Sequence, residues 1–425
     1  MRRRQPARRS PAAAGPAAAL LAATAGLLAA GLLAATPAAQ LEPAAAGWVE
    51  TTLAGMTLDE KVGQLVMPSF RSTYLSTDSA EFDRLAALVR EQHPGGFLMF
   101  GGRDPAPDVL LNPGYSRSTL GQPLAGASIN NRLQALSTLP LLNAADFETG
   151  IGFRLRGGTT FPRAMAFGAA GDEGLAYEAG RITAVEARAL GVHVNFAPVA
   201  DVNNNPRNPV INTRSFGEDP AVVARLASAW VRGLQAGGVV ATLKHFPGHG
   251  DTDVDSHRGL PLIAHPRARL DRVELPPFRA GIAAGAGAVM TSHVAMPRLD
   301  AGVVRPATVS PPVITGLLRR DLGFDGLVYT DSMRMRGITN ELSPGRAAVA
   351  AVAAGHDVVV HSPDDAAAFA GLRRAVERGT LTEARIDASA RRILAAKAAL
   401  GLHRTRAINL DDLPRVVGAR AHRRV

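Results

Sequence analysis

Residues 244–257 form the densest group of side chains able to do chemistry: three histidines, three aspartates and a lysine within 14 positions. The Gly and Pro residues of this segment favour a non-helical loop, and its acids and histidines can exchange protons near neutral pH. Alternating His and Asp side chains could bind zinc and activate a water molecule. In a metal-free alternative, Asp255 binds one ring nitrogen of His257, which leaves the other nitrogen free to protonate a leaving group.

Polar residues also follow short apolar runs at six points along the chain. They are Asp146 and Glu148, Asn195 and Asp201, Lys244 and His245, Ser292 and His293, Asp331, and His361. A charged side chain directly after a buried strand is costly unless it is paired. Several such side chains meeting at one place therefore indicate a functional site.

The elements that must position these residues are parallel β/α units. From Gly47 onward, apolar runs rich in Val, Leu, Phe and Met alternate with stretches of helical periodicity. The predicted strands are residues 65–70, 96–100, 139–145, 192–199, 239–245, 288–293, 327–331 and 357–361, and three of the predicted helices are residues 171–190, 220–237 and 386–400. Eight units in series predict an α/β fold, a closed (β/α)8 TIM barrel that forms a single catalytic domain. The active site of such a barrel lies at the C-terminal ends of its strands.

The sequence also predicts where the domain begins and ends. Residues 1–46 combine an Arg-rich start with a long Ala/Leu run and end in a short linker. This pattern indicates a signal peptide or an uncleaved membrane anchor. The adjacent arginines match a twin-arginine export signal loosely. The barrel is assigned to residues 47–405, with an irregular surface insertion at 101–129, and residues 406–425 form a basic C-terminal tail. We therefore expect a secreted or extracytoplasmic protein, with no membrane span in the mature form unless the N-terminal segment is retained.

Composition narrows the remaining classes of function. The formal charge is +10, but arginines at the two ends supply much of it. The sequence has no basic stripe interleaved with aromatic residues, so it gives no indication of nucleic-acid binding. There is no cysteine, which excludes disulfides, thiolate metal sites and cysteine nucleophiles. Hydrophobic residues make up 46% of the chain, enough for a large core, and a monomer is the default expectation.

Several segments resemble motifs of glycoside hydrolase family 3, in particular its branch of β-N-acetylglucosaminidases with an Asp-His acid/base pair. The resemblance covers residues 244–257, the acidic motif Asp146-Phe147-Glu148, the arginine motif at 208–216, Thr291-Ser292-His293 and the segment 328–333 around Asp331. It departs from the family pattern at Thr149, where a glycine is usual, and at Ser332, where an alanine is usual.

The resemblance implies a retaining mechanism that removes terminal β-linked N-acetylglucosamine. Asp331 would form a glycosyl-enzyme, and His257, held by Asp255, would act as general acid and then as general base. By the same resemblance, the sugar would be bound by Asp146, Arg214, Lys244 and His245, with His249 and His293 in possible support of the site. No metal and no cofactor is expected.

Some of these residues also have purely structural interpretations. Asp331 could cap a helix that begins directly after it. Arg214 could form an exposed ion pair with Glu218 or Asp219, which would be worth little to stability.

Two other functions remain open at this point: a metal-dependent TIM-barrel hydrolase and a non-catalytic sugar-binding protein. The sequence does not separate peptidoglycan from chitin-derived substrates, or hydrolysis from phosphorolysis. It likewise leaves open signal cleavage versus anchoring, and the oligomeric state.

Overall fold

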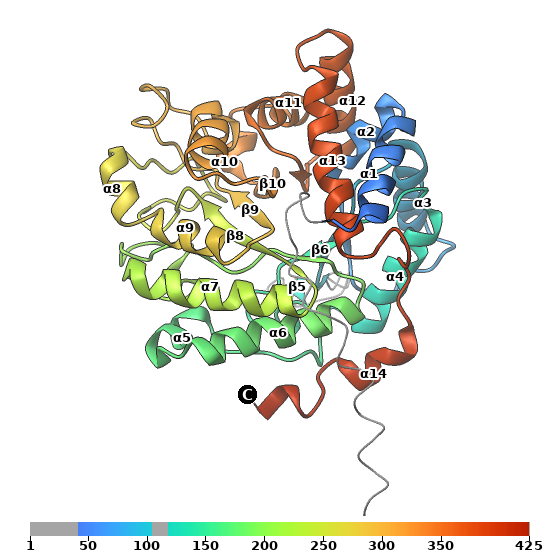
Figure 1. Cartoon of the computed structure of the whole chain (residues 1–425), viewed down its shortest axis with the longest axis horizontal. Coiled ribbons are helices and arrows are strands. Elements are labelled where there is room, and N and C mark those ends of the chain that lie inside the picture. Colours follow the sequence, from blue (N-terminus) through green and yellow to red (C-terminus); the bar gives the residue numbers. More distant parts are fainter. Residues whose placement is uncertain (1–40, 104–117, 425) are drawn as a thin grey trace, which may run out of the picture. The chain divides into compact units, whose positions relative to one another are not determined.

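The computed structural model describes residues 41–103 and 118–424, all within one compact unit, Leu33–Val425 (Figure 1). The predicted signal or anchor run and residues 104–117 of the predicted insertion therefore lie outside the described residues. No helix in the described part of the chain is long and apolar enough to cross a membrane.

Short strands occur at all eight predicted positions. They are β1 Val66–Met67 with β2 Ser69–Arg71, β3 Leu98–Phe100, β6 Ala144–Ala145, β7 Val194–Asn195, β8 Val240–Phe246, β9 Ala288–Thr291, β10 Leu327–Tyr329 and β11 Val359–Val360. A seven-stranded sheet has the order β10-β9-β8-β7-β6-β3-β2, and every pairing within it is parallel. The additional strands β4 Gly102–Arg103 and β5 Ser118–Thr119 pair antiparallel. The fold is thus α/β with a mostly parallel sheet.

The named strands do not form one closed barrel. β1 and β11 make a separate parallel pair in which Val66 faces Val359, and an isolated parallel bridge joins Tyr329 to Val358. Only Pro68 separates β1 from β2 in the sequence. The predicted α/β class with parallel strands is therefore confirmed, whereas closure of the sheet into a (β/α)8 barrel is not.

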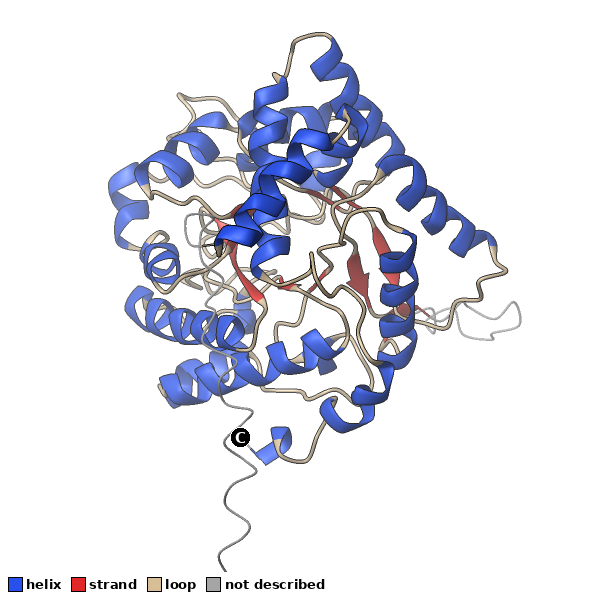
Figure 2. Ribbon diagram, turned by 45° about the vertical axis from the view of Figure 1, so that its right-hand side comes forward, coloured by secondary structure: helices blue, strands red, loops and turns tan. Residues whose placement is uncertain are grey.

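The helices lie around the strands (Figure 2). They are α1 Pro43–Gly55, α2 Leu58–Gln64, α3 Ala80–Ala87, α4 Pro123–Leu136, α5 Ala164–Ala170, α6 Glu173–Ala189, α7 Pro220–Ala236, α8 Arg267–Arg272, α9 Pro276–Ala283, α10 Arg336–Thr339, α11 Pro344–Ala354, α12 Asp365–Glu377, α13 Glu383–Ala399 and α14 Leu413–Val416. A π-helical segment, Pro312–Asp321, lies between β9 and β10. Helices α6, α7 and α13 occur where the periodicity predicts them.

Local sequence explains where the two long helices α6 and α7 begin. The Asp172 carboxylate accepts hydrogen bonds from two first-turn amides of α6, and Asp219 does the same for α7, whose first residue is Pro220. Their apolar faces are buried, and Trp230 of α7 packs edge-on against Phe167 at 5.4 Å between ring centroids.

Three boundaries differ from the sequence-based expectation. Helix α1 begins at Pro43, four residues before the predicted start of the folded part, because its apolar residues pack against α13. Helix α4 begins at Pro123, inside the insertion expected to be irregular, where Pro at the first turn favours a helix start. The segment after residue 405 is also placed: Leu413 is buried in the core, and His422 contacts the buried Glu186 of α6.

Candidate active site

A cavity of about 520 Å³ opens at the C-terminal ends of the parallel strands. Seven of the nine predicted site residues line it: Asp146, Arg214, Lys244, His245, His249, His257 and Asp331. Asp255 and His293 do not line the cavity, but each hydrogen-bonds a segment that does. The structure therefore brings together residues that are up to 185 positions apart in the sequence, from Asp146 to Asp331.

Glu148 is the centre of an ion network on one wall of this cavity. Arg214 donates two hydrogen bonds to its carboxylate, at 3.0 and 2.8 Å, and the Lys244 ammonium lies 2.8 Å from Glu148 Oε1. Lys244 also donates to Asp146 at 3.0 Å, and Arg154 pairs with the other oxygen of Asp146 at 3.0 Å. The structural alternative for Arg214, an exposed pair with Glu218 or Asp219, is wrong because Glu148 is its partner.

The network keeps every member charged. Burial acts to raise the pKa of Glu148, but the charges of Arg214 and Lys244 hold it well below its usual value. Burial acts to lower the pKa of Lys244, but Glu148 and Asp146 raise it above its usual value. The pKa of Asp146 is lowered in the same way, against its burial, by Lys244 and Arg154. Fixed charges of both signs suit recognition of a polyhydroxylated ligand.

His245 is held by an aspartate that the sequence did not single out for this role. The Nδ1 atom of His245 lies 2.7 Å from Asp201 Oδ2, and the backbone amide of His249 donates to Asp201 Oδ1 at 2.7 Å. Asp201 is fully buried. Since a carboxylate accepts, His245 Nδ1 carries the hydrogen, and His245 Nε2 faces Arg214 Nη2 at 3.4 Å as an acceptor. The ring orientation and tautomer of His245 are thereby set.

Asp255 and His257 form a pair at the exposed edge of the cavity. His257 Nδ1 lies 2.8 Å from Asp255 Oδ1, and the His257 backbone amide donates to the same oxygen at 2.8 Å. Burial acts to raise the pKa of Asp255, but these hydrogen bonds lower it below its usual value. The His257 side chain is 60% exposed, so its Nε2 is accessible from the cavity and from solvent.

His249 stabilises the loop that carries this pair. Its two ring nitrogens lie 2.9 Å from Thr252 Oγ1 and 2.9 Å from Ser256 Oγ, and the residue is buried. Burial lowers the pKa of His249 to about 4, so the ring is neutral at neutral pH. Ser256 precedes His257 directly, so His249 fixes the backbone next to the exposed imidazole.

Asp331 follows β10 and lies half-buried in the cavity wall. Its Oδ1 accepts a hydrogen bond from the Ser332 amide at 2.7 Å, while His293 Nε2 donates to the Ser332 carbonyl at 3.1 Å. Asp331 is not a helix cap, because the next helix, α10, begins only at Arg336 and its cap position is Met335.

Four residues contribute to the site without having been assigned a role from the sequence. Glu148 and Asp201 pair with side chains 66 and 44 positions away, and Arg154 and His361 line the cavity. Glu148, Asp201 and His361 do follow apolar strands, so the strand-end pattern was a usable signal for these three. Arg154 follows the short helix Ile151–Phe153 instead, and no strand-end signal marks it.

The described side chains include no cluster of three or more His, Cys, Asp or Glu residues arranged to hold a metal ion. In the loop that could have supplied zinc ligands, His249 and His257 bind hydroxyls and a carboxylate instead. Their geometry is that of a hydrogen-bonded His-Asp pair and of a buried histidine that holds the loop next to it.

Comparisons with known proteins find relatives of this chain in sequence and in structure. The chain is 34% identical over 372 residues to the β-N-acetylglucosaminidase/β-glucosidase of Cellulomonas fimi, covering 86% of this chain and 61% of that protein. It is 39% identical over 302 residues to β-hexosaminidase A of Pseudoalteromonas piscicida, covering 64% of this chain and 50% of that protein. The chain therefore spans only part of the length of these two curated relatives.

A solved structure of a family 3 β-N-acetylglucosaminidase from Paenibacillus sp. str. FPU-7 superposes with a TM-score of 0.75 at 44% identity, covering 84% of this chain and 65% of that chain. The pattern of the glycosyl hydrolase family 3 N terminal domain matches residues 57–396. This match spans most of the chain, from α2 to α13, so the protein belongs to glycosyl hydrolase family 3.

Proposed function

We propose that the protein is a retaining β-N-acetylglucosaminidase that removes terminal β-linked N-acetylglucosamine from cell-wall or chitin-derived saccharides. The observation that carries the proposal is the pairing of His257 Nδ1 with Asp255 Oδ1 at 2.8 Å, beside a cavity that His257 shares with Asp331. The names of the relatives support the same activity.

In the proposed first step, Asp331 attacks the anomeric carbon while His257 Nε2 donates a proton to the departing oxygen. The Asp255 carboxylate stabilises the imidazolium before it gives up this proton, and holds the ring in the tautomer that leaves Nε2 available. In the second step, neutral His257 removes a proton from an incoming water, which releases the sugar with retained configuration. Because Asp331 would be the only reacting carboxylate, a histidine acid/base, which is cationic or neutral but never anionic, avoids a second negative charge beside it.

The ion network would bind the sugar. Arg214 and Lys244 would donate to hydroxyls or to the acetamido group, His245 would contact the sugar, and Asp146 would accept from hydroxyls. These groups are held by Glu148 and Asp201, so little side-chain freedom would be lost when the sugar binds.

We further propose that the strands close into a (β/α)8 barrel. The bridge between Tyr329 and Val358 and the near-continuity of β1 with β2 support this. Secretion, or anchoring through residues 1–46, is likewise a proposal that rests on the sequence of that segment.

The test is turnover of p-nitrophenyl β-N-acetylglucosaminide beside the β-glucoside, with and without a chelator. The parent protein is compared with Asp331→Asn, His257→Ala and the matched loop control Asp253→Asn. Selective, chelator-resistant turnover that only the first two substitutions abolish supports the proposal. Chelator-sensitive turnover rescued by zinc would point to a metal-dependent hydrolase, and binding without turnover to a sugar-binding protein. Product analysis with and without phosphate separates hydrolysis from phosphorolysis.

A further inference from the structure

Glu186 of α6 is a fully buried carboxylate that the proposed mechanism does not use. It accepts hydrogen bonds from two segments that are far apart in the sequence. From the first, the amide of Thr159 donates to Oε2 at 3.0 Å and the Thr159 hydroxyl donates to Oε1 at 2.5 Å. From the second, the amide of Gly418 and Nδ1 of His422 lie 2.9 and 2.7 Å from Oε1. All four groups can donate, so Glu186 ties the two segments together.

The second of these, the C-terminal segment of residues 413–424, runs back beside α6 (Figure 1). Leu413 anchors its first residue in the main core. At Gly418, where φ is 64°, the segment approaches Gly157 so closely that a Cβ at residue 418 would lie 2.1 Å from Gly157 O. The C-terminal segment is therefore packed directly against residues 157–159.

The first segment belongs to the loop of residues 150–161 between β6 and α5, the cavity loop. Backbone hydrogen bonds join its two arms. The Gly152 amide donates to Thr159 O at 2.9 Å, and the Phe161 amide donates to Thr149 O at 2.8 Å. A shift of Thr159 would therefore move the start of the loop, directly after the ion network.

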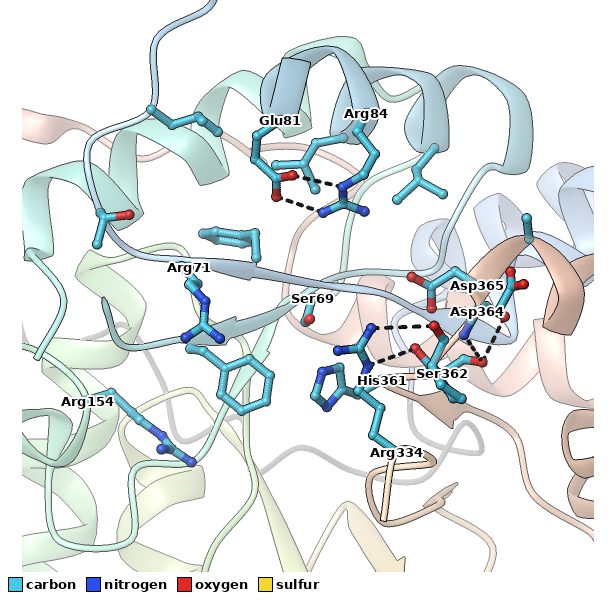
Figure 3. Close-up of a pocket in the computed structure, with 18 residues that line it drawn as sticks. Ser69, Arg71, Glu81, Arg84, Arg154, Arg334, His361, Ser362, Asp364 and Asp365 are labelled. Atoms are coloured by element: carbon cyan, nitrogen blue, oxygen red, sulfur yellow. Dashed lines mark hydrogen bonds and ion pairs between the residues drawn. The ribbon is translucent and has the colours of Figure 1, made fainter. Parts of the chain in front are cut away.

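Arg154 is the side chain by which the cavity loop reaches the ion network. It pairs with Asp146 at 3.0 Å and lies over the Phe100 ring at 5.4 Å from its centroid. It lines the active-site cavity and also an adjoining cavity of about 1000 Å³ (Figure 3). Its carbonyl accepts from the Gly121 amide at 2.8 Å, but its buried Nε has no hydrogen-bond partner in the described part of the chain. The position of the guanidinium thus depends on how the loop is held.

We infer that Glu186 and the C-terminal segment form a brace that positions Arg154, the partner of Asp146, for sugar binding. Glu186 and His422 are positioning residues, since neither lines the active-site cavity and both act through Thr159. A buried carboxylate that loses a donor is costly, so the two segments hold each other in place. The inference rests on the proposed glycosidase function and gives the predicted basic tail a role in substrate affinity.

The test removes and then restores one donor of the brace. His422→Ala deletes the imidazole, whereas His422→Asn keeps an N–H donor near the position of Nδ1. Arg420→Ala is the matched control, because Arg420 is exposed, lies two positions from His422 and forms no side-chain hydrogen bond within residues 41–103 and 118–424. Kinetics with p-nitrophenyl β-N-acetylglucosaminide gives kcat and KM, and hydrogen exchange of the amides at 150–161 reports opening of the cavity loop.

His422→Ala should raise KM by about three- to tenfold, the effect of losing roughly one hydrogen bond, and should leave kcat within about twofold. The reason is that Arg154 and Asp146 would hold the sugar equally in the ground state and in the transition state. The amides of the cavity loop should exchange faster. His422→Asn should restore both KM and exchange, and Arg420→Ala should change neither.

A lower kcat at constant KM would overturn the inference, because it would indicate only a smaller folded fraction. An unchanged KM and unchanged exchange in His422→Ala would overturn it as well. Val49→Ala, which weakens the packing of α1 on α13, is a second control and should lower stability without raising KM. If the parent does not turn the glycoside over, the proposed function fails, and hydrogen exchange alone decides. Faster exchange of the cavity loop in His422→Ala then supports the brace, and unchanged exchange refutes it.

Discussion

The hydroxyl of Ser332 lies 2.9 Å from Nδ1 of His361, which joins the residue after Asp331 to the end of the neighbouring strand β11. His361 is held in turn by its backbone, with a φ of 52°, and by contact with the Phe100 ring at 4.9 Å between centroids. Ser332 thus has three anchors: its amide on Asp331, its carbonyl on His293 and its hydroxyl on His361. The residue next to Asp331 is therefore fixed through its hydroxyl as well as through its backbone.

We therefore predict that Ser332→Ala lowers kcat by roughly three- to tenfold, the effect of losing one hydrogen bond, with KM almost unchanged. Steady-state kinetics with p-nitrophenyl β-N-acetylglucosaminide measures this. Ser343→Ala, at an exposed serine without a cap contact, is the control. A rise in KM at constant kcat would show that Ser332 serves sugar binding and does not position Asp331.

His257→Ala should lower kcat/KM by about 10² to 10⁴ for leaving groups that need a proton, and far less for dinitrophenol, which does not. Azide should restore turnover and yield a β-glycosyl azide, because a small nucleophile can enter where the imidazole was. Asp255→Asn should lower the rate less, since the ring remains but its imidazolium loses a charged partner. Equal losses for all leaving groups would argue against proton donation by His257.

Glu148→Gln should destabilise the fold by roughly 3 kcal/mol at neutral pH, because Arg214 and Lys244 lose their shared buried carboxylate. The pKa of Glu148 lies lower in the folded state than the usual 4.5, so its stabilising effect is present above about pH 4.5 and is lost as the pH falls below that value. Urea unfolding at pH 7 and pH 3.5 should show the parent and variant curves converging in acid. Exposed Glu341→Gln should change neither curve, and a pH-independent difference would contradict the assignment.

Lys397→Met should stabilise the protein at neutral pH. Lys397 is fully buried, and burial lowers its pKa to about 7 from 10.5, with a hydrogen bond to Gln64 as its contact. Between pH 7 and 10.5 the folded state then binds fewer protons than the unfolded state. Burial of the Lys397 ammonium therefore destabilises the folded state to its full extent below pH 7, and no longer does so above pH 10.5. The gain should be roughly 2–5 kcal/mol at pH 6.5, reduced by the lost Gln64 contact, and smaller at pH 9.5.

Thermal unfolding of the parent and Lys397→Met at both pH values checks this. Arg374→Met, on the exposed face of α12, serves as the control. A loss of stability in Lys397→Met at pH 6.5 would mean that the Gln64 contact outweighs the cost of burying the ammonium.

Local patterns were sufficient to locate the strands and the long helices. The segment that forms β8 is apolar before Lys244 except for Thr242, and Asp219-Pro220 marks the start of α7. The same patterns overestimated strand lengths, since the chain leaves the sheet after only two residues in β6, β7 and β11. The length over which a strand is hydrogen-bonded depends on the neighbouring strands that it meets at each of its ends. The strand's own sequence does not contain that information.

The pairings of the site were harder to predict than its members. The strand ends pointed to Glu148, Lys244 and Asp331, but not to the contact between Glu148 and Arg214 across 66 positions. Such contacts depend on side-chain direction and on the spacing of neighbouring strands. The Asp255–His257 contact could be foreseen because the two residues are only two positions apart.

Helix α1 covers one face of α13, with Ala45, Val49 and Leu53 packed against Ala390 and Leu394. This contact sets how far the chain can be shortened from its N-terminal side. A processing event or a recombinant version that starts at or before residue 42 keeps the whole of α1 in place. One that starts beyond Leu53 would expose an apolar stripe on the last long helix, at a loss of roughly 1.5–3 kcal/mol for each of Val49 and Leu53. Any shortening of the chain from its N-terminal side and the stability of the fold are thus coupled through a helix that lies far from Asp331 in the sequence.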